Sequence, residues 1–251
     1  MGCAREDARI ALGNLKPADP TLGGVMTGFD IQRAPSIAQE AIVNVSREAV
    51  IHGIQMYVEV IAENKEYLTR LDSAIGDADH GINMDRGFQS VLGKLPSVAD
   101  KDIGSIFKAV GMALVSSVGG ASGPLYGTFF IKLGTSTAGK LELTQQDWAS
   151  ALEAGVNGVI LLGKASLGDK TMVDSLVPGL EALKVALADG AGYGEALRRS
   201  ADAAKRGMES TIPLIARKGR ASYLGERSAG HQDPGATSSY LLLDTLANAW
   251  T

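Results

Sequence analysis

The chain has 251 residues, of which 45% are hydrophobic and 21% charged, and its formal net charge at pH 7 is −4. This length and balance are typical of a soluble globular protein with one large domain or two small ones. The negative net charge argues against nucleic acid as a partner, and no apolar run is long enough to span a bilayer. Cys3 is the only cysteine, which excludes an internal disulfide. Because no signal-peptide pattern opens the chain, the sequence predicts a cytoplasmic protein.

The N-terminal part of the chain differs in composition from the rest. Residues 15–24 are rich in turn-forming residues and show no apolar periodicity. We therefore interpret residues 1–35 as an N-terminal extension or linker. Residues 36–251 are assigned to one helical domain.

The first predicted helix follows this extension. Ser36, with Gln39 three residues later, has the pattern of a capping box and predicts a helix start. Apolar residues then recur at close to helical spacing from Ala38 to Leu71. This pattern predicts either one long helix or two helices, with an interruption near Gly53.

Helical spacing continues along the rest of the chain, with Gly and Pro at the joints. Pro178 is expected to kink or end the helix that contains it. No stretch alternates for long enough to predict a sheet strand, so the sequence predicts an all-α fold, an antiparallel bundle whose connections carry the chemistry. The further helices are expected over about 84–92 and 103–114, after Pro124, from Thr144 with Asp147 as its capping acid, and from near Thr171, Gly194 and Gly235.

One stretch, which reads LDSAIGDADHGINMDRG, carries three closely spaced aspartates. We predict a helix that ends near Ile75, with Asp72 in its last turn and Asp77 and Asp79 on the following loop. Carboxylates crowded at a helix C-terminus repel one another and oppose the helix dipole, and a bound cation would reverse both effects. Such ligands suit Mg²⁺ that is shared with nucleotide phosphates. An Asp-rich turn that caps the next helix explains the same residues, so the sequence leaves both interpretations open.

Glycine-rich and basic segments occupy several of the predicted joints. Small residues let a ligand approach the backbone, a helix N-terminus presents free N–H groups to phosphate, and arginine binds phosphate through its forked donors. Taken alone, a glycine-rich segment is explained at least as well as a tight turn, and the basic segment 217–227 is explained better as a solvated surface. His80 and His231, both in polar loops, suit hydrogen bonding to phosphate better than phosphoryl carriage. The four segments are 116–124, 168–171, 217–227 and 230–239.

The acidic stretch and three longer stretches that contain the glycine-rich and basic segments together resemble one family closely, the L subunits of dihydroxyacetone kinases (glycerone kinases). They follow the order found in the family, and the likeness runs from about Glu66 to the C-terminus. The segments read LDSAIGDADHGINMDRGF, SSVGGASGPLYGTFF, GDKTMVDSLVP and ARKGRASYLGERSAGHQDPGATSSYLLL. The resemblance implies an antiparallel barrel of eight helices with a nucleotide site at one end, in the interhelix loops. The longer N-terminal part departs from the family and leaves oligomeric state and partner docking open.

The resemblance also implies the ligands of the site. Asp72, Asp77 and Asp79 would bind two Mg²⁺ ions that bridge to the phosphates of ADP or ATP. Arg220 is in addition a candidate catalytic residue, because transfer of a phosphoryl group depends on positioning and electrostatic stabilisation. The positions matched to nucleotide contacts are His80, Gly81, Ile82, Asn83, Ala121, Ser122, Gly163, Met172, Arg220, Asp233, Pro234 and Gly235.

The activity implied is phosphoryl transfer to dihydroxyacetone, or a related short ketose, held on a separate K subunit, so the chain should be active only with that subunit. Two donor modes remain open. Either ADP stays bound and is rephosphorylated by a phosphotransferase-system phosphocarrier (an M subunit) fed by phosphoenolpyruvate, or ATP binds and leaves as a substrate. No nucleic acid or membrane partner is expected, and the sequence leaves a homodimer open.

Alternatives from other classes share some of these features. A regulatory nucleotide-binding module that contacts a transcription factor predicts tight binding of that regulator and no kinase activity when a K subunit is added. A fatty-acid-kinase-like nucleotide domain has a similar acidic loop, but the GHQDPGATS and GGASGP stretches favour the ketose kinases. A purely structural bundle ranks last, because it would not need three crowded aspartates.

Overall fold

The structure is a computed structural model that describes residues 44–251. Helices make up most of that range, and the only strands in it are two of two residues each, which confirms the all-α prediction. The two short strands form a single antiparallel pair, Val45 opposite Leu143. The elements are β1 (Val45–Ser46), α1 (Arg47–Glu63), α2 (Lys65–Ile75), α3 (His80–Lys94), η1 (Leu95–Ser97), α4 (Ile103–Ser117), α5 (Ser122–Ser136), β2 (Glu142–Leu143), α6 (Gln145–Gly163), α7 (Val173–Ala188), α8 (Tyr193–Ser210), η2 (Arg220–Ser228) and α9 (Pro234–Ala249).

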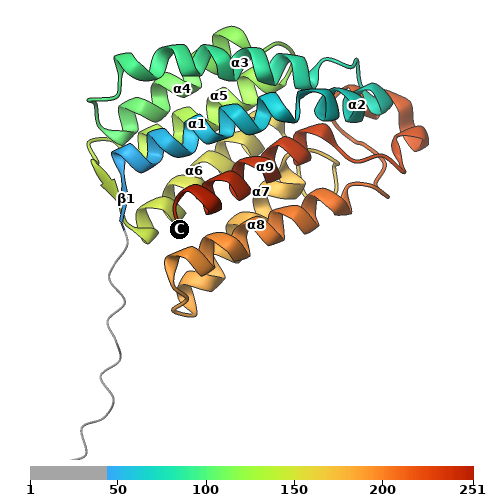
Figure 1. Ribbon diagram of the computed structural model, residues 1–251. Coiled ribbons are helices and arrows are strands. Elements are labelled where there is room, and N and C mark those ends of the chain that lie inside the picture. Colours follow the sequence, from blue (N-terminus) through green and yellow to red (C-terminus); the bar gives the residue numbers. More distant parts are fainter. Residues whose placement is uncertain (1–43) are drawn as a thin grey trace, which may run out of the picture. The chain divides into compact units, whose positions relative to one another are not determined.

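The helices form a closed ring (Figure 1). From α3 onward each helix packs against the next one in the chain, and α9 returns to pack against α1, which also contacts α3. Short connections between neighbours make them antiparallel. Since α1 and α2 follow each other directly around Asn64, they take one place in the ring, which gives the eight-helix barrel that the family resemblance implied.

Large side chains fill the inside of the barrel. Tyr57 of α1 meets Phe88 of α3 edge to face, with ring centroids 4.8 Å apart, and Phe88 in turn contacts Phe130 of α5. At another point Trp148 of α6 meets Trp250 with centroids 4.7 Å apart. These residues come from helices far apart in the sequence, so their burial holds the ring closed.

Several helix ends follow the sequence signals. Thr144 and Asp147 form the predicted capping box at the start of α6. The helix predicted from near Thr171 is α7, which begins at Val173; it does not end at Pro178 but runs on to Ala188. Pro178 has no N–H group, so the carbonyl of Asp174, four residues earlier, lacks its helical hydrogen bond. This carbonyl faces Gly207 of α8. Packing of α8 on α7 therefore covers the disrupted turn.

The prediction for the first helix was partly wrong. Its proposed capping box at Ser36 lies outside the described residues, and so does the boundary predicted at residue 35. Within the described range, α1 begins at Arg47, with the side chain of Ser46 accepting a hydrogen bond from Ala49. Gly53 does not interrupt it, because that glycine lies against Trp250 and is held by tertiary packing. The break comes at Asn64.

A close contact between α4 and α5 gives a first testable prediction. A Cβ atom on Gly111 would lie 2.6 Å from the carbonyl oxygen of Gly127, so the two backbones approach as only glycine allows. Gly111→Ala is expected to lower the free energy of unfolding by about 1–3 kcal/mol, because the helices must move apart. Urea denaturation measures this change.

Gly93 is the matched control, because it too lies inside a helix but a Cβ atom added to it would meet no other atom within 4 Å. Gly93→Ala is expected to leave the free energy of unfolding unchanged or raise it by up to about 1 kcal/mol. Equal effects of the two substitutions would contradict the close-approach argument.

None of the helices between residues 44 and 251 combines the length and the apolar character that a bilayer crossing requires.

Candidate functional site

Four joints meet at one end of the barrel. Because neighbouring helices are antiparallel, the joints between α2 and α3, α4 and α5, α6 and α7, and α8 and α9 all lie at the same end (Figure 1). Each joint leads into a helix whose free N–H groups and positive dipole end face that end of the barrel. A cavity of about 610 Å³ opens among them, a size that suits a nucleotide-sized ligand.

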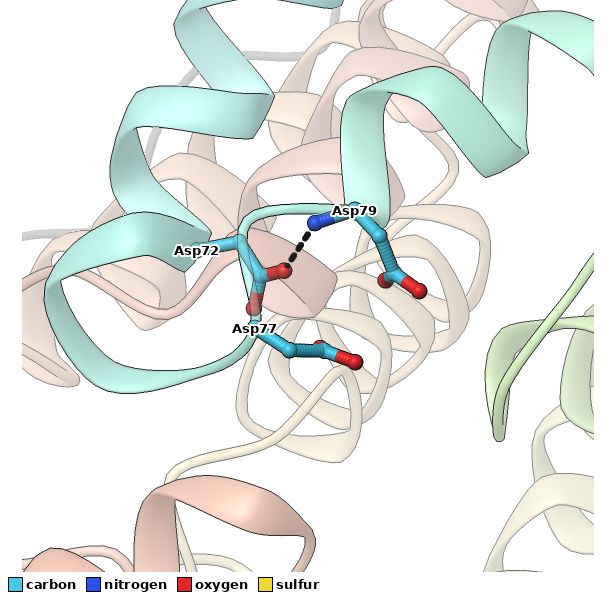
Figure 2. Close-up of side chains that lie close together, drawn as sticks. All are labelled: Asp72, Asp77 and Asp79. Atoms are coloured by element: carbon cyan, nitrogen blue, oxygen red, sulfur yellow. Dashed lines mark hydrogen bonds between the residues drawn. The ribbon is translucent and has the colours of Figure 1, made fainter.

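Three aspartates stand on one side of this cavity. Asp72 lies in the last turn of α2, and Asp77 and Asp79 lie on the short loop before α3, as the sequence predicted. Each offers a carboxylate oxygen, and these three oxygens lie within 4.8 Å of one another (Figure 2). Such a hard-oxygen donor set fits Mg²⁺ that keeps further positions for water or phosphate.

The main chain is folded tightly around Asp72. One of its carboxylate oxygens accepts hydrogen bonds from the backbone N–H groups of Asp79, at 2.9 Å, and His80, at 3.1 Å. Just before them Ala78 has a φ of 61°, a left-handed conformation that costs a non-glycine residue about 1–2 kcal/mol. The side chain of Asp72 therefore holds a strained loop that brings the other two carboxylates beside it.

Arg220 reaches across the mouth of the cavity from η2. Its guanidinium makes an ion pair of 3.0 Å with Asp77. The arginine side chain is 68% exposed and that of the aspartate 33%, so the pair contributes little to stability. The pair matters for position, because it holds the positively charged guanidinium of Arg220 beside the aspartates of the cavity.

His80 links three of the four joints. Its Nε2 lies 3.0 Å from the hydroxyl of Ser238 in α9, and its Nδ1 lies 3.1 Å from the hydroxyl of Ser122 in α5. Ser238 donates its own proton to the carbonyl of Pro234 and accepts one from Tyr126. When Ser238 donates to this carbonyl, the matching tautomer of His80 has the proton on Nε2, directed at Ser238, and Nδ1 accepts from Ser122.

Burial lowers the pKa of His80 to about 4, although the charges of Asp72 and Asp79 act in the opposite direction. The ring is therefore neutral at pH 7, in agreement with its hydrogen bonds. A neutral imidazole that bridges α3, α5 and α9 fixes the N-termini of these helices relative to one another. Its role in the described geometry is to shape the site.

Comparison with known proteins identifies the family. The sequence model of the DAK2 domain matches residues 74–248, most of the chain. The chain belongs to the DAK2 domain family. This confirms the resemblance found in the sequence.

Two bacterial relatives of the DAK2 domain match nearly over their full length. The chain is 49% identical over 206 residues to the "PEP-dependent dihydroxyacetone kinase, ADP-binding subunit DhaL" of Escherichia coli K12, covering 82% of this chain and 98% of that protein. It is 45% identical over 197 residues to the "PEP-dependent dihydroxyacetone kinase 2, ADP-binding subunit DhaL" of Listeria innocua, covering 78% of this chain and 91% of that protein.

Solved structures show the same fold. The dihydroxyacetone kinase of C. freundii in its native form matches with a TM-score of 0.61 and 22% identity over 91% of this chain. The same enzyme in complex with AMP-PNP and Mg²⁺ matches with a TM-score of 0.61 and 23% identity over 90% of this chain. The DAK2 domain described here spans 38% of the length of those chains.

Most of the predicted site residues line the cavity of this DAK2 domain. Gly81, Ile82 and Asn83 are not among the lining residues. Gly81 faces the backbone of α2, Ile82 is 47% exposed, and the buried Asn83 accepts a hydrogen bond from Arg86. Their contact with a nucleotide stays a prediction. The predicted residues found at the cavity are Asp72, Asp77, Asp79, His80, Ala121, Ser122, Gly163, Met172, Arg220, Asp233, Pro234 and Gly235.

The apolar wall of the DAK2 cavity was not predicted from the sequence. Leu125, Val159 and Ala165 line it beside the predicted Met172. Leu125 and Val159 lie inside apolar helices and have no local feature that separates them from core residues. Only the meeting of α5, α6 and the following joint makes these side chains a wall of the cavity.

A buried carboxyl group also lines the cavity. Asp233 caps α9 by accepting a hydrogen bond of 2.7 Å from the N–H of Ala236. Burial raises the pKa of Asp233 from 3.8 to about 7, and the charge of Asp174 acts in the same direction, whereas the cap and Lys170 oppose it. The DAK2 site therefore combines an acidic, accessible side with a carboxyl group that is close to its titration point at neutral pH.

Proposed function

We propose that this chain is the nucleotide-binding subunit of a dihydroxyacetone kinase. The observation that carries the proposal is a single cavity lined by three convergent carboxylates and by an apolar wall, at the N-termini of four helices. Helix N-termini and a shared divalent cation stabilise phosphate groups, and an apolar wall suits a purine base. The family and the printed names of the relatives support the same function.

The proposed metal ligands are Asp72, Asp77 and Asp79. The carboxylate of Asp79 accepts no hydrogen bond from any group in the described part of the chain, so it is available to a cation. Two Mg²⁺ ions shared among three carboxylates and the phosphates would offset the charge of the transferring group. The chain itself positions these ligands through the bonds from Asp72 to the strained loop.

The proposed orientation of the nucleotide follows from the two sides of the cavity. The base would lie against Met172, Leu125 and Val159, and the phosphates would extend toward the aspartates. Arg220, at the mouth beside Asp77, is the candidate that stabilises charge on the transferring phosphoryl group. In this assignment His80 shapes the site and does not carry the phosphoryl group.

Of the two donor modes, we propose that ADP stays bound as a cofactor. Four relatives at 40–49% identity carry the words "ADP-binding subunit" in their names, and these names are "PEP-dependent" or "PTS-dependent". In this mode the partners are a phosphocarrier of the phosphotransferase system and a K subunit that binds the short ketose. A cytoplasmic location is part of the proposal, because these partners act there.

The test is to purify the protein without added nucleotide, denature it and quantify the released adenine nucleotide and magnesium. Close to one ADP and two Mg²⁺ per chain are expected. A protein without nucleotide that binds Mg-ATP reversibly would favour ATP as a substrate. A folded protein that binds neither Mg-ADP nor Mg-ATP would overturn the proposed function.

A further inference from the structure

Lys170, on the joint between α6 and α7, is buried in an unusual way. Its relative exposure is 1%, and it is the only lysine in the buried class between residues 44 and 251. Its backbone has a φ of 62°, a left-handed conformation that is unfavourable for a side-chain-bearing residue. Burial of an ammonium group is costly unless every proton has a partner. Such a residue needs a compensating role in the fold or the site.

The ammonium group of Lys170 finds three partners, all of them main-chain carbonyls. It donates to the carbonyl of Thr211 at 2.7 Å, to that of Ile212 at 3.4 Å, and to that of His231 in a further short hydrogen bond. An ammonium group has three protons, so its hydrogen-bonding capacity is used up inside the protein. Lys170 therefore has no free proton to donate to a ligand.

These carbonyls belong to the two ends of the long joint between α8 and α9. Thr211 and Ile212 directly follow α8, and His231 lies three residues before α9. The N–H of Gly230 also donates to the carbonyl of Ile212, at 2.7 Å. One side chain from the α6–α7 joint thus holds together the beginning and the end of a different joint.

The same contacts fix the cavity wall. The N–H of Asp233 donates to the hydroxyl of Thr211 at 3.0 Å, so the cap of α9 stands on the segment that Lys170 holds. Asp233 and Gly235, from the α8–α9 joint, line the cavity, and so do Lys170 itself and Met172, two residues after it. Two walls of the cavity therefore depend on Lys170.

The loop that carries Lys170 is itself fixed by carboxylates. Asp174 accepts hydrogen bonds from the N–H groups of Gly168, at 2.5 Å, and Thr171, at 2.7 Å. The carbonyl of Asp169 accepts the N–H of Arg217, which leads into the basic segment at the cavity mouth. Burial lowers the pKa of Lys170, while the charges of Asp233 and Asp174 act to raise it. The surrounding charges therefore favour the ammonium form that the three carbonyls need.

We propose that Lys170 is a positioning residue for the nucleotide cavity, which tethers the α8–α9 joint to the α6–α7 joint and so holds Asp233 and Met172 in their binding positions. Lys170 is itself one of the residues that line the cavity, but its ammonium group is bonded to main-chain carbonyls, so it acts through Asp233 and Met172. The effect on nucleotide affinity rests on the proposed function, whereas the effect on the joints does not. Preorganised walls lower the entropy cost of binding, so loss of the tether should weaken binding.

The test uses the full chain with Lys170→Met and a milder variant, Thr211→Val, which removes the acceptor of the Asp233 N–H. Two quantities are measured well below the melting temperature, the dissociation constant for Mg-ADP by calorimetry and amide hydrogen exchange of the nucleotide-free protein. Thr245→Val is the matched control, because this buried hydroxyl bonds only to the carbonyl of Leu241 within α9.

We expect Lys170→Met to weaken Mg-ADP binding by about 10- to 100-fold and Thr211→Val by a few-fold to about 10-fold. In both variants, amide exchange should become faster over 211–217 and 229–236 but not in α4 or α5. The control should change neither quantity. If Lys170→Met does not fold, Lys170→Arg, which keeps the charge but cannot direct three protons from one nitrogen to the same carbonyls, decides by the same two measurements.

Unchanged exchange over both segments would overturn the proposal, and so would faster exchange with unchanged Mg-ADP affinity. If the unmodified protein binds no nucleotide, the proposed function fails first. The exchange pattern of the variants then still decides whether Lys170 tethers the two joints.

Discussion

The Asp79→Asn variant is expected to bind Mg-ADP at least about 100-fold more weakly than the unmodified protein. Asp79 contributes one of the three convergent carboxylates, and replacing a charged oxygen ligand by an amide removes most of its attraction for Mg²⁺. The substitution keeps the size of the side chain. It also leaves the start of α3 unchanged, because the side chain of Asp79, the N-cap residue, makes no capping hydrogen bond. Calorimetric titration of nucleotide-free protein measures the affinity.

The same variant should be at least as stable as the unmodified protein when metal and nucleotide are absent. Three carboxylates within 4.8 Å repel one another in the empty site, and removal of one charge relieves this repulsion. With Mg-ADP added the order should reverse, because ligand binding stabilises only the protein that binds it. Thermal unfolding with and without Mg-ADP shows both effects.

Asp100→Asn is the control, since Asp100 is an exposed aspartate that pairs only with Lys101 and lies away from the cavity. It should bind Mg-ADP like the unmodified protein and unfold at the same temperature. If Asp79→Asn binds Mg-ADP within a few-fold of this control, the aspartates are not the metal ligands. The interpretation of the acidic loop as a simple capping turn would then be favoured.

Features coded by residues close in sequence could be predicted. The helix end at Ile75, with Asp72 in its last turn, followed from the glycine and the crowded acids beside it. The capping box of Thr144 with Asp147 likewise needs only four residues. Short-range hydrogen bonds and dipole effects decide these features, so a single sequence carries them.

Features coded by distant partners could not be predicted from local patterns. The strand at Val45 exists only because it pairs with Leu143, far along the chain. The helix through Gly53 continues because Trp250, near the other end of the chain, packs on it. Lys170 reads as a surface lysine in a polar turn, yet the carbonyls that bury it belong to a joint some forty to sixty residues later.

The Asp233→Asn variant is expected to be more stable than the unmodified protein above pH 7 and equally stable near pH 4. Burial raises the pKa of Asp233 from 3.8 to about 7, so the folded protein holds this proton more tightly than the unfolded chain does. Below pH 4 both states are protonated and the group contributes nothing. Between pH 4 and 7 only the unfolded chain releases the proton, so stability falls as pH rises.

Above pH 7 this shift corresponds to about 4 kcal/mol. Asparagine cannot ionise, and it caps a helix about as well as aspartate does, so it can accept the hydrogen bond from Ala236 without the cost of burying a charge. The gain in free energy of unfolding, variant minus unmodified protein, should therefore grow from about zero at pH 4 toward a few kcal/mol at pH 8. Urea denaturation at several pH values between these limits measures it.

Asp102→Asn is a control with the opposite sign. Asp102 caps α4 at the other end of the barrel, and hydrogen bonds from Ser105 and Gly139 lower its pKa to about 2. Its ionised form is therefore favoured in the folded state, and the asparagine variant should lose stability at neutral pH. If Asp233→Asn also lost stability at pH 8, its carboxylate would be stabilised by Lys170 and the cap more than it is penalised by burial. A gain in stability together with weaker Mg-ADP binding would show that the chain keeps a costly buried carboxyl group at this position for the sake of its ligand.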